Sequence, residues 1–316
     1  MANTIFKDLT TKAAQLVSTD RVVSIWLGDS IIAGTSMAPT STIIDPGSIY
    51  PATLTRGQFW DKWVHADRLV LSDGSFSWDD VTTTSGGITS GVGYTPPFYG
   101  HSLYLGGSGT ADFTANINHV NAVKHYTVVL GISASSINDD LSVVTNPLAH
   151  WEPSVDNGAF ELLTENYIQP ALSNLRAGGT NTLYLEGIYL HIGNDAYNGA
   201  TYFPIEIAQK YDIYLRRLIF ALEQFLEFSG IPVCILQTPQ LPSDYAHAGT
   251  IRAAQARVAA ARPRTILVNP NQFPQGTDHV HFNAMGNIKY GYEAAQAVRA
   301  AFPNQFAQLA AKADHW

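Results

Sequence analysis

Apolar positions along the chain form short β-type runs that alternate with longer segments of helical periodicity. The runs are β-branched or aromatic, and several are followed by Gly, Asn or Pro, which favours buried strands. They occupy residues 22–27, 127–132, 183–192, 233–237 and 266–268. Helical patterns occupy residues 160–176, 205–228 and 250–261, with a last helix from about residue 283. This alternation predicts a parallel sheet with right-handed crossovers.

The stretch from Gly34 to Asn118 departs from this pattern because it is rich in Gly, Ser and Thr with dispersed aromatic residues. Aromatic side chains in loops can bind sugars or simply cover a core. Two interpretations therefore stay open, a β-rich insertion that carries substrate contacts and ordered loops packed over the sheet. We expect a single domain over residues 1–316, with an insertion at about residues 35–118.

Composition excludes several classes of protein. With 316 residues and 46% hydrophobic content, the chain can bury a large core. Its formal charge of −8, with 18 Lys plus Arg, lacks the basic footprint of a nucleic-acid-binding protein, so we expect no nucleic-acid partner. The one cysteine, Cys234, lies in an apolar run, which predicts a core thiol and no intrachain disulfide.

We also expect no membrane partner, because no apolar run is long enough to cross a bilayer. The first residues lack the basic start and apolar stretch of a secretory signal. A location in a cytoplasm or in a larger particle such as a virion is therefore expected. Whether the chain forms a homo-oligomer is left open.

Candidate chemistry begins with Gly28-Asp29-Ser30, which directly follows the first apolar run and places a serine at the C-terminal end of a predicted strand. Ligands bind at that edge of an open α/β sheet. A serine hydroxyl is a weak nucleophile unless a base takes its proton, and a histidine oriented by a carboxylate suits that task. Asp278 and His281 are three residues apart, so one turn presents both on one face. We therefore predict Ser30, Asp278 and His281 as a catalytic set.

A further polar group, Gly193-Asn194-Asp195, follows the apolar run 183–192. The Asn194 amide could donate to an oxyanion, an interaction that contributes roughly 3 kcal/mol in enzymes from which it has been removed. The alternative is that Asn194 and Asp195 form an Asx-turn or a helix cap. His191 and His247 also lie near strand ends, where a lone histidine is more often structural, so neither enters the catalytic set.

These motifs resemble those of the SGNH, or GDSL-like, hydrolase superfamily. Gly28-Asp29-Ser30 matches its first block, residues 193–195 resemble its third, and Asp278-x-x-His281 matches its fifth. The resemblance implies Ser30 as nucleophile, His281 as base and Asp278 as its partner, with the Ser30 backbone N–H and the Asn194 side chain in the oxyanion hole. It also implies a flavodoxin-like three-layer α/β/α sandwich around a parallel sheet of about five strands, and no cofactor.

Two departures from the family pattern concern the oxyanion hole. Ile192 stands where the third block has glycine, and the glycine is shifted to Gly193. The second block supplies a glycine N–H, but the matching segment after residues 127–132 reads Ser133-Ala134-Ser135. The backbone N–H of Ala134 or Ser135 could serve, because glycine only eases the backbone geometry. A glycine between residues 86 and 93 is the alternative donor.

Within the superfamily the chain is most similar to the carbohydrate acetylesterases related to sialate O-acetylesterase. Gly100-His101-Ser102-Leu103 and the residues 278–286 carry this likeness, although the branch's Gln-Gly-Glu third block is missing. The resemblance implies an O-acetylated carbohydrate as substrate. Ser30 would attack the acetyl carbonyl, and water would then hydrolyse the acetyl-enzyme.

Three other classes of protein share part of this pattern. A lipase of the α/β-hydrolase type needs Gly-x-Ser-x-Gly, but Ile32 stands where the second glycine should be. A metalloenzyme could use His279 and His281 with Asp278, but no second cluster of ligand spacing is evident. A non-catalytic carbohydrate-binding or structural module on a hydrolase scaffold is the main alternative, and the intact Ser30, Asp278 and His281 argue against it.

Overall fold

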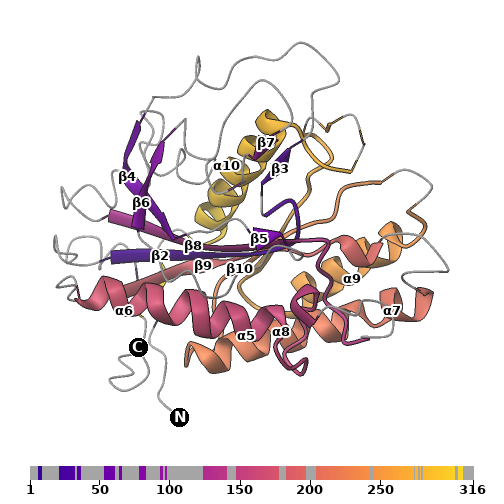
Figure 1. Ribbon diagram of the computed structural model, residues 1–316, viewed down its shortest axis with the longest axis horizontal. Helices are drawn as coiled ribbons and strands as arrows, with labels where there is room; N and C mark the ends of the chain where they lie inside the picture. Colours follow the sequence, from indigo (N-terminus) through magenta and orange to yellow (C-terminus); the bar gives the residue numbers. More distant parts are fainter. Residues whose placement is uncertain are drawn as a thin grey trace.

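A computed structural model describes most of the sheet and the helices that pack on it (Figure 1). The described residues are 6–8, 21–32, 34–36, 53–60, 64–65, 78–82, 93–94, 97, 124–140, 147–177, 183–196, 204–241, 245–273, 275–276, 278, 280–302 and 305–308. The strands are β1 (Phe6–Asp8), β2 (Arg21–Gly28), β3 (Thr35–Ser36), β4 (Thr53–Trp60), β5 (Val64–His65), β6 (Trp78–Thr82), β7 (Gly93–Tyr94), β8 (Lys124–Ser133), β9 (Leu183–His191), β10 (Val233–Leu236), β11 (Thr265–Val268) and β12 (Gln305–Gln308).

The α-helices are α5 (Ala159–Leu162), α6 (Gln169–Ala177), α7 (Ile205–Gln209), α8 (Tyr211–Phe225), α9 (Ala248–Ala261) and α10 (Ala284–Ala301). A π-helical segment, η2 (Leu163–Ile168), joins α5 to α6, and short 3₁₀ turns form η1 (Pro147–Ala149) and η3 (Asn194–Ala196).

The sheet is built on five parallel strands in the order β8-β2-β9-β10-β11. In chain order these are strands 2-1-3-4-5, the flavodoxin-like arrangement. The order reverses at β2, because the chain first adds β8 on one side and then β9 on the other. A ligand site is expected where the order reverses, just beyond the carboxyl ends of these strands. β4 continues the sheet parallel to β8, and β6 pairs antiparallel with β4.

Alternating side chains of the sheet enter two separate cores. Val23, Ile25 and Leu27 of β2 pack against the helices α5, α6, α8 and α9, which cover one face. Trp26 points to the other face, where α10 covers the sheet, and its ring stacks on Tyr189 with centroids 4.2 Å apart. The period-2 alternation of a strand thus makes β2 the middle layer of an α/β/α sandwich.

A bulge in β9 changes which side chains face each core. The register between β2 and β9 shifts between Val23 and Ser24, because Glu186 has no partner in the pairing. Leu185 before the bulge and Ile188 after it therefore both face the α8 side, although they are an odd number of residues apart. All nine residues of β9 are buried.

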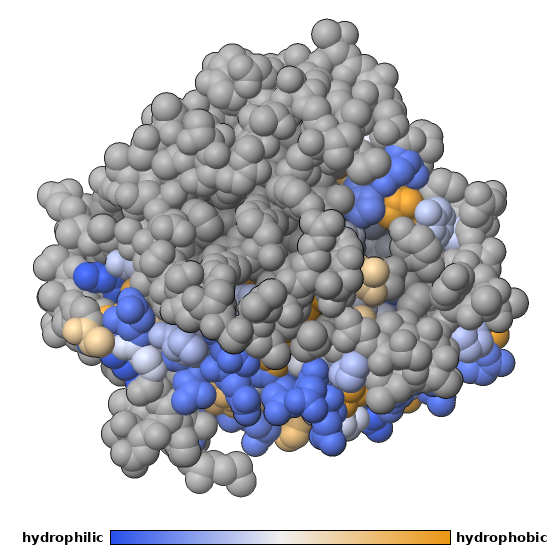
Figure 2. Space-filling view, viewed as in Figure 1, coloured by the Kyte–Doolittle hydropathy of each residue, from blue (hydrophilic) through white to orange (hydrophobic). Residues whose placement is uncertain are grey.

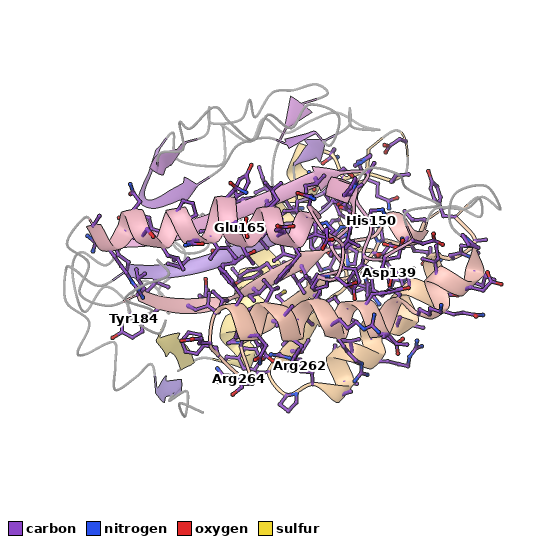
Figure 3. The ribbon with its side chains drawn as sticks, turned by 60° about the horizontal axis from the view of Figure 1, so that its bottom comes forward. Asp139, His150, Glu165, Tyr184, Arg262 and Arg264 are labelled. Atoms are coloured by element: carbon purple, nitrogen blue, oxygen red, sulfur yellow. The ribbon has the colours of Figure 1, made fainter. Side chains whose placement is uncertain are left out.

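Figure 3 distinguishes the two ends of the sheet. Asp139 and His150, in the segment after β8, lie toward one end, whereas Tyr184 and Arg264, at the starts of β9 and β11, lie toward the other. The first end is therefore the carboxyl edge of the parallel strands. On the face viewed in Figure 2, the described surface along the lower helices is mostly hydrophilic, as expected for the outer side of a sandwich layer.

The expected fold class is confirmed. The five predicted strands and the helical segments appear within a few residues of their expected bounds. The helix expected over residues 205–228 is divided at Lys210 into α7 and α8. Cys234 is buried in the core under α10. Among the described helices, none combines the length and apolar character needed to cross a bilayer.

The segment expected to be an insertion, residues 35–118, is described only in part. Its described strands are β3 to β7, of which β4, β5 and β6 join the main sheet and β3 pairs with β7. Whether this segment carries substrate contacts stays a prediction, as does the single domain over residues 1–316.

Candidate active site

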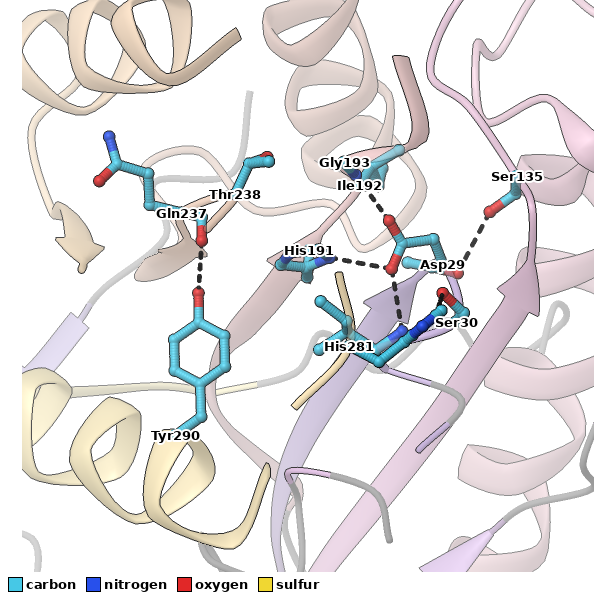
Figure 4. Close-up of polar contacts among 12 residues, drawn as sticks. Asp29, Ser30, Ser135, His191, Ile192, Gly193, Gln237, Thr238, His281 and Tyr290 are labelled. Carbon is cyan, nitrogen blue, oxygen red and sulfur yellow. Dashed lines mark hydrogen bonds and ion pairs between the residues drawn. The ribbon is translucent and has the colours of Figure 1, made fainter. Parts of the chain in front are cut away.

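Ser30, His281 and Asp278 form a continuous hydrogen-bonded chain just past the carboxyl end of β2. Ser30 Oγ lies 2.8 Å from His281 Nε2, and His281 Nδ1 lies 2.6 Å from Asp278 Oδ2 (Figure 4 draws the Ser30 and His281 side chains). Ser30 and His281 are 251 positions apart in sequence. The structure therefore brings together the three side chains predicted as the catalytic set.

The proton positions in this chain follow from the donors available. An ionised carboxylate can only accept, so His281 Nδ1 carries the proton that bonds to Asp278. In the neutral ring Nε2 then has a free lone pair, and the Ser30 hydroxyl donates to it. This is the arrangement in which a histidine can remove a proton from a serine.

Asp278 is held in its orientation by its own loop. Its second oxygen, Oδ1, accepts from the backbone N–H groups of Val280 and His281 at 3.1 and 3.0 Å. Partial burial would raise the pKa of Asp278, but the hydrogen bond from the His281 side chain and these two N–H groups outweigh it and lower the pKa. The carboxylate is thus charged throughout the neutral range.

The segment after His281 anchors this loop to the core and to a helix. Phe282 is fully buried and packs edge-on against Tyr290 and Phe273. Asn283 then caps α10, because its side chain accepts from the N–H of Gly286 at 2.9 Å. His281 is therefore anchored by the buried ring and the capped helix that follow it.

Gly28 permits the tight turn that presents Ser30. Its φ is +155°, and a Cβ at this position would lie 1.7 Å from the carbonyl oxygen of His191. The backbone N–H of Asp29 donates to that same carbonyl at 3.0 Å. The ends of β2 and β9 consequently approach more closely than any residue with a side chain would allow.

Asp29 is the second feature of this turn and was not predicted to have a role. Its buried carboxylate accepts from His191 Nδ1 at 2.9 Å and from the Gly193 N–H at 2.6 Å, and also from the Ile31 N–H at 3.0 Å (Figure 4). Burial would raise the pKa of Asp29, but the nearby His191 and the hydrogen bonds outweigh this and lower it. His191, expected to be structural, is thus the side-chain partner of a charge next to Ser30.

The loop after β8 contains Ala134 and Ser135, the two candidate oxyanion donors of the second block. The structure distinguishes one from the other. The Ser135 N–H already donates to the Ile132 carbonyl at 3.1 Å, while the Ser135 hydroxyl donates to the Gly28 carbonyl at 3.4 Å. Ala134 has φ +62°, the left-handed conformation that glycine adopts most readily. Ala134 therefore occupies the backbone geometry for which a glycine would be the usual choice. The alternative glycines before Gly93 lie outside the described residues.

Asn194 begins the 3₁₀ turn η3, which is separated from the end of β9 by two residues, and its side chain lies outside the described ones. Its oxyanion role stays a prediction. The next residue, Asp195, is fully buried and accepts from the Ile137 N–H and from Asn138 Nδ2, each at 2.9 Å. Burial raises the pKa of Asp195 to about 6. Asp195 thereby ties the loop after β8 to η3, so the two loops that carry Ala134 and Asn194 are joined by a buried carboxylate.

The metal alternative depends on His279, which lies outside the described residues. Among the residues that the structure does describe, no group of three or more His, Cys, Asp or Glu side chains is placed to hold a metal ion.

Comparison with known proteins gives similarity of fold. No protein-family model matches the chain, and no curated protein matches it in sequence. Among solved structures, a protein from Arabidopsis thaliana is 14% identical with a TM-score of 0.58, covering 90% of this chain and 99% of that one. NanS is 10% identical with a TM-score of 0.57, covering 90% and 98%. A carbohydrate acetylesterase from Xanthomonas citri is 14% identical with a TM-score of 0.54, covering 90% of this chain and 57% of that one. The chain shares a fold with these proteins.

Proposed function

We propose that this protein is a carboxylic ester hydrolase with Ser30 as nucleophile, His281 as general base and Asp278 as the partner that orients the base. One observation carries the proposal: the 2.8 Å contact between Ser30 Oγ and His281 Nε2, extended by the 2.6 Å contact to Asp278. A polar network in the core or a helix cap would not require a hydroxyl, an imidazole and a carboxylate to be hydrogen-bonded in this order. Its location at the carboxyl edge of the sheet, beside the reversal of strand order, is where such folds bind ligands.

The proposed reaction has two steps that share one histidine. Ser30 Oγ attacks the acyl carbonyl carbon while its proton passes to His281 Nε2, and a tetrahedral oxyanion forms. His281 then gives that proton to the leaving alkoxide as the ester bond breaks, which leaves an acyl-Ser30. Water, deprotonated by the same nitrogen, hydrolyses the acyl-enzyme and regenerates Ser30 with release of the acid.

The oxyanion requires donors that point at it before the reaction starts. We assign this role to the Ser30 backbone N–H, the Asn194 side chain and the Ala134 backbone N–H. Ala134 is preferred to Ser135 because its left-handed conformation reproduces the backbone of a glycine turn.

The proposed substrate is an O-acetylated carbohydrate. The sequence resemblance to carbohydrate acetylesterases supports it, and so does the fold shared with the Xanthomonas citri protein, which is itself a carbohydrate acetylesterase. We expect acetyl esters to be cleaved faster than octanoyl esters. Faster cleavage of octanoyl than acetyl 4-nitrophenyl esters would contradict this substrate class.

The test compares wild type with Ser30→Ala for acetate release from 4-nitrophenyl acetate and from a panel of O-acetylated polysaccharides. Ser173→Ala is the matched control, because Ser173 is a partly exposed serine of α6, outside the site. The expected result is loss of turnover by several orders of magnitude in Ser30→Ala alone. Equal background rates in all three proteins, with polysaccharide binding retained, would favour the non-catalytic binding module instead.

A further inference from the structure

The carboxylate of Asp29 joins two loops of the proposed site. It accepts one hydrogen bond from its own turn, at the Ile31 N–H, and two from the end of β9, at His191 Nδ1 and the Gly193 N–H. Asp29 directly precedes Ser30 in sequence, and Gly193, which donates to Asp29, directly precedes Asn194. A buried carboxylate is costly unless all its oxygens are bonded, so these three donors fix it in one place. Asp29 thus sets the distance between the two loops.

The side chain of His191 makes one hydrogen bond in this arrangement. Its side chain is 2% exposed, and Nδ1 donates to Asp29 because an ionised carboxylate can only accept. The other ring nitrogen, Nε2, is buried with no hydrogen-bond partner. The ring otherwise makes an edge contact with Tyr290, with centroids 6.4 Å apart. An apolar side chain would fill this space without leaving a buried nitrogen unbonded, so the bond to Asp29 is the feature that requires histidine.

We propose that Asp29 and His191 form a positioning pair, which holds the Ser30 turn against the start of η3 and so fixes the nucleophile relative to the oxyanion donor Asn194. This inference rests on the proposed ester hydrolysis. The pair does not touch the reacting atoms. It acts through the backbone next to Ser30 and Asn194.

A positioning pair predicts a particular kinetic signature. Misplacing a nucleophile by a fraction of an ångström reduces stabilisation of the transition state more than it reduces the affinity for substrate. Loss of the pair therefore lowers kcat by about 10- to 100-fold while KM changes by less than about threefold. A residue that only fills the core would instead leave kcat of the folded enzyme unchanged.

The experiment uses two substitutions at one position. His191→Leu removes the donor at similar volume, whereas His191→Asn keeps an N–H donor at the place of Nδ1. We expect the kcat loss in His191→Leu and recovery to within about fivefold of wild type in His191→Asn. Equal kcat in the two variants, or kcat within threefold of wild type in folded His191→Leu, would overturn the positioning role.

His191→Leu leaves Asp29 without its side-chain partner and could fail to fold. Asp29→Asn is therefore measured alongside, since it keeps the shape and removes the charge. Circular dichroism identifies the folded variants, and a kcat of Asp29→Asn within threefold of wild type would also overturn the inference. Failure of the proposed function has a different signature, because wild type and Ser30→Ala would then hydrolyse esters at the same background rate, and the inference would fall with it.

Discussion

The carboxylate of Asp278 has a protonation state fixed by its hydrogen-bond partners. Asp278 accepts three hydrogen bonds from its own loop and from His281, and its pKa is lowered. It consequently remains ionised at neutral pH. Protonation of His281 at Nε2 would remove the lone pair that the Ser30 hydroxyl requires.

We therefore predict that kcat/KM falls as the pH is lowered and the base of the proposed mechanism takes up a proton. Asp278→Asn removes the acceptor that selects the Nδ1–H tautomer and should lower kcat by roughly 10³- to 10⁴-fold. Initial rates on 4-nitrophenyl acetate across pH 5–8 measure the pH dependence of kcat/KM. A flat profile over that range would exclude a histidine base.

The pKa of Asp195 is shifted in the opposite direction from that of Asp278, because burial raises it from the ordinary value of 3.8 to about 6. In the unfolded chain it ionises near pH 4, whereas in the folded protein it keeps its proton until about pH 6. The folded state binds more protons between these values, so stability from this group is complete below pH 4 and is lost as pH rises to about 6.

The corresponding prediction is that the free energy of unfolding of wild type, relative to Asp195→Asn, falls by up to about 3 kcal/mol between pH 4 and pH 7. Urea unfolding at each pH measures both proteins. Asp29 and Asp278 do not interfere, because their lowered pKa values place their contribution below pH 4 and both proteins retain them. A difference that does not vary with pH would show that Asp195 is ionised in the folded state throughout.

At the scale of elements, β2, β9 and β10 are predictable because they are buried on both faces and read as nearly continuous apolar runs. The break between α7 and α8 is not, since Lys210 adopts φ −92° and ψ 0° within an otherwise continuous helical pattern. The π-helical segment η2 is likewise not predicted, because residues 160–176 as a whole carry apolar residues at helical spacing. β4 and β6 lie in Gly, Ser and Thr-rich sequence, whose pattern is too weak to assign strands.

The candidate site likewise has one part that the sequence predicts and one part that it does not. Ser30, Asp278 and His281 are predictable because the residues around them, a glycine after a strand and an Asp-x-x-His turn, are local signals. The contact between Asp29 and His191 depends on the register that sets Gly28 opposite His191, and no local pattern encodes that register. His191 at the end of a buried strand is the one signal that was available.

The approach of β2 to β9 gives a sharp test with a matched control. Gly28→Ala places a Cβ 1.7 Å from a backbone oxygen, so we expect it to destabilise the fold by about 3 kcal/mol or more. Gly249→Ala, in α9, meets no atom within 4 Å and should stabilise the protein by about 0.5–1 kcal/mol. Urea denaturation compares them, and equal stabilities would contradict the close approach of the two strand ends.

At the scale of the whole molecule, α10 connects the histidine loop to the segment that contains Pro97. A Cβ at Gly291 of α10 would lie 1.5 Å from the Pro97 carbonyl oxygen, and Pro97 is buried. The helix and this segment are therefore packed backbone to backbone. A glycine in mid-helix normally costs stability, which indicates that this contact is what it permits.

Gly291→Ala is expected to lower the free energy of unfolding by about 2 kcal/mol, although the same change in an open helix position raises it. Gly249→Ala again serves as the open-position control. Thermal and urea unfolding of the two variants measure the effect. A stabilised Gly291→Ala protein would mean that Pro97 does not rest on α10.

The strand order also determines when this site can exist during synthesis. β2 pairs with β8 on one side and β9 on the other, so the central strand lacks at least one of its two neighbours until both have left the ribosome. The partner of the Ser30 hydroxyl, His281, lies 251 positions further along the chain. Contacts of that sequence separation form late in folding. The proposed nucleophile is thus synthesised well before its proposed base.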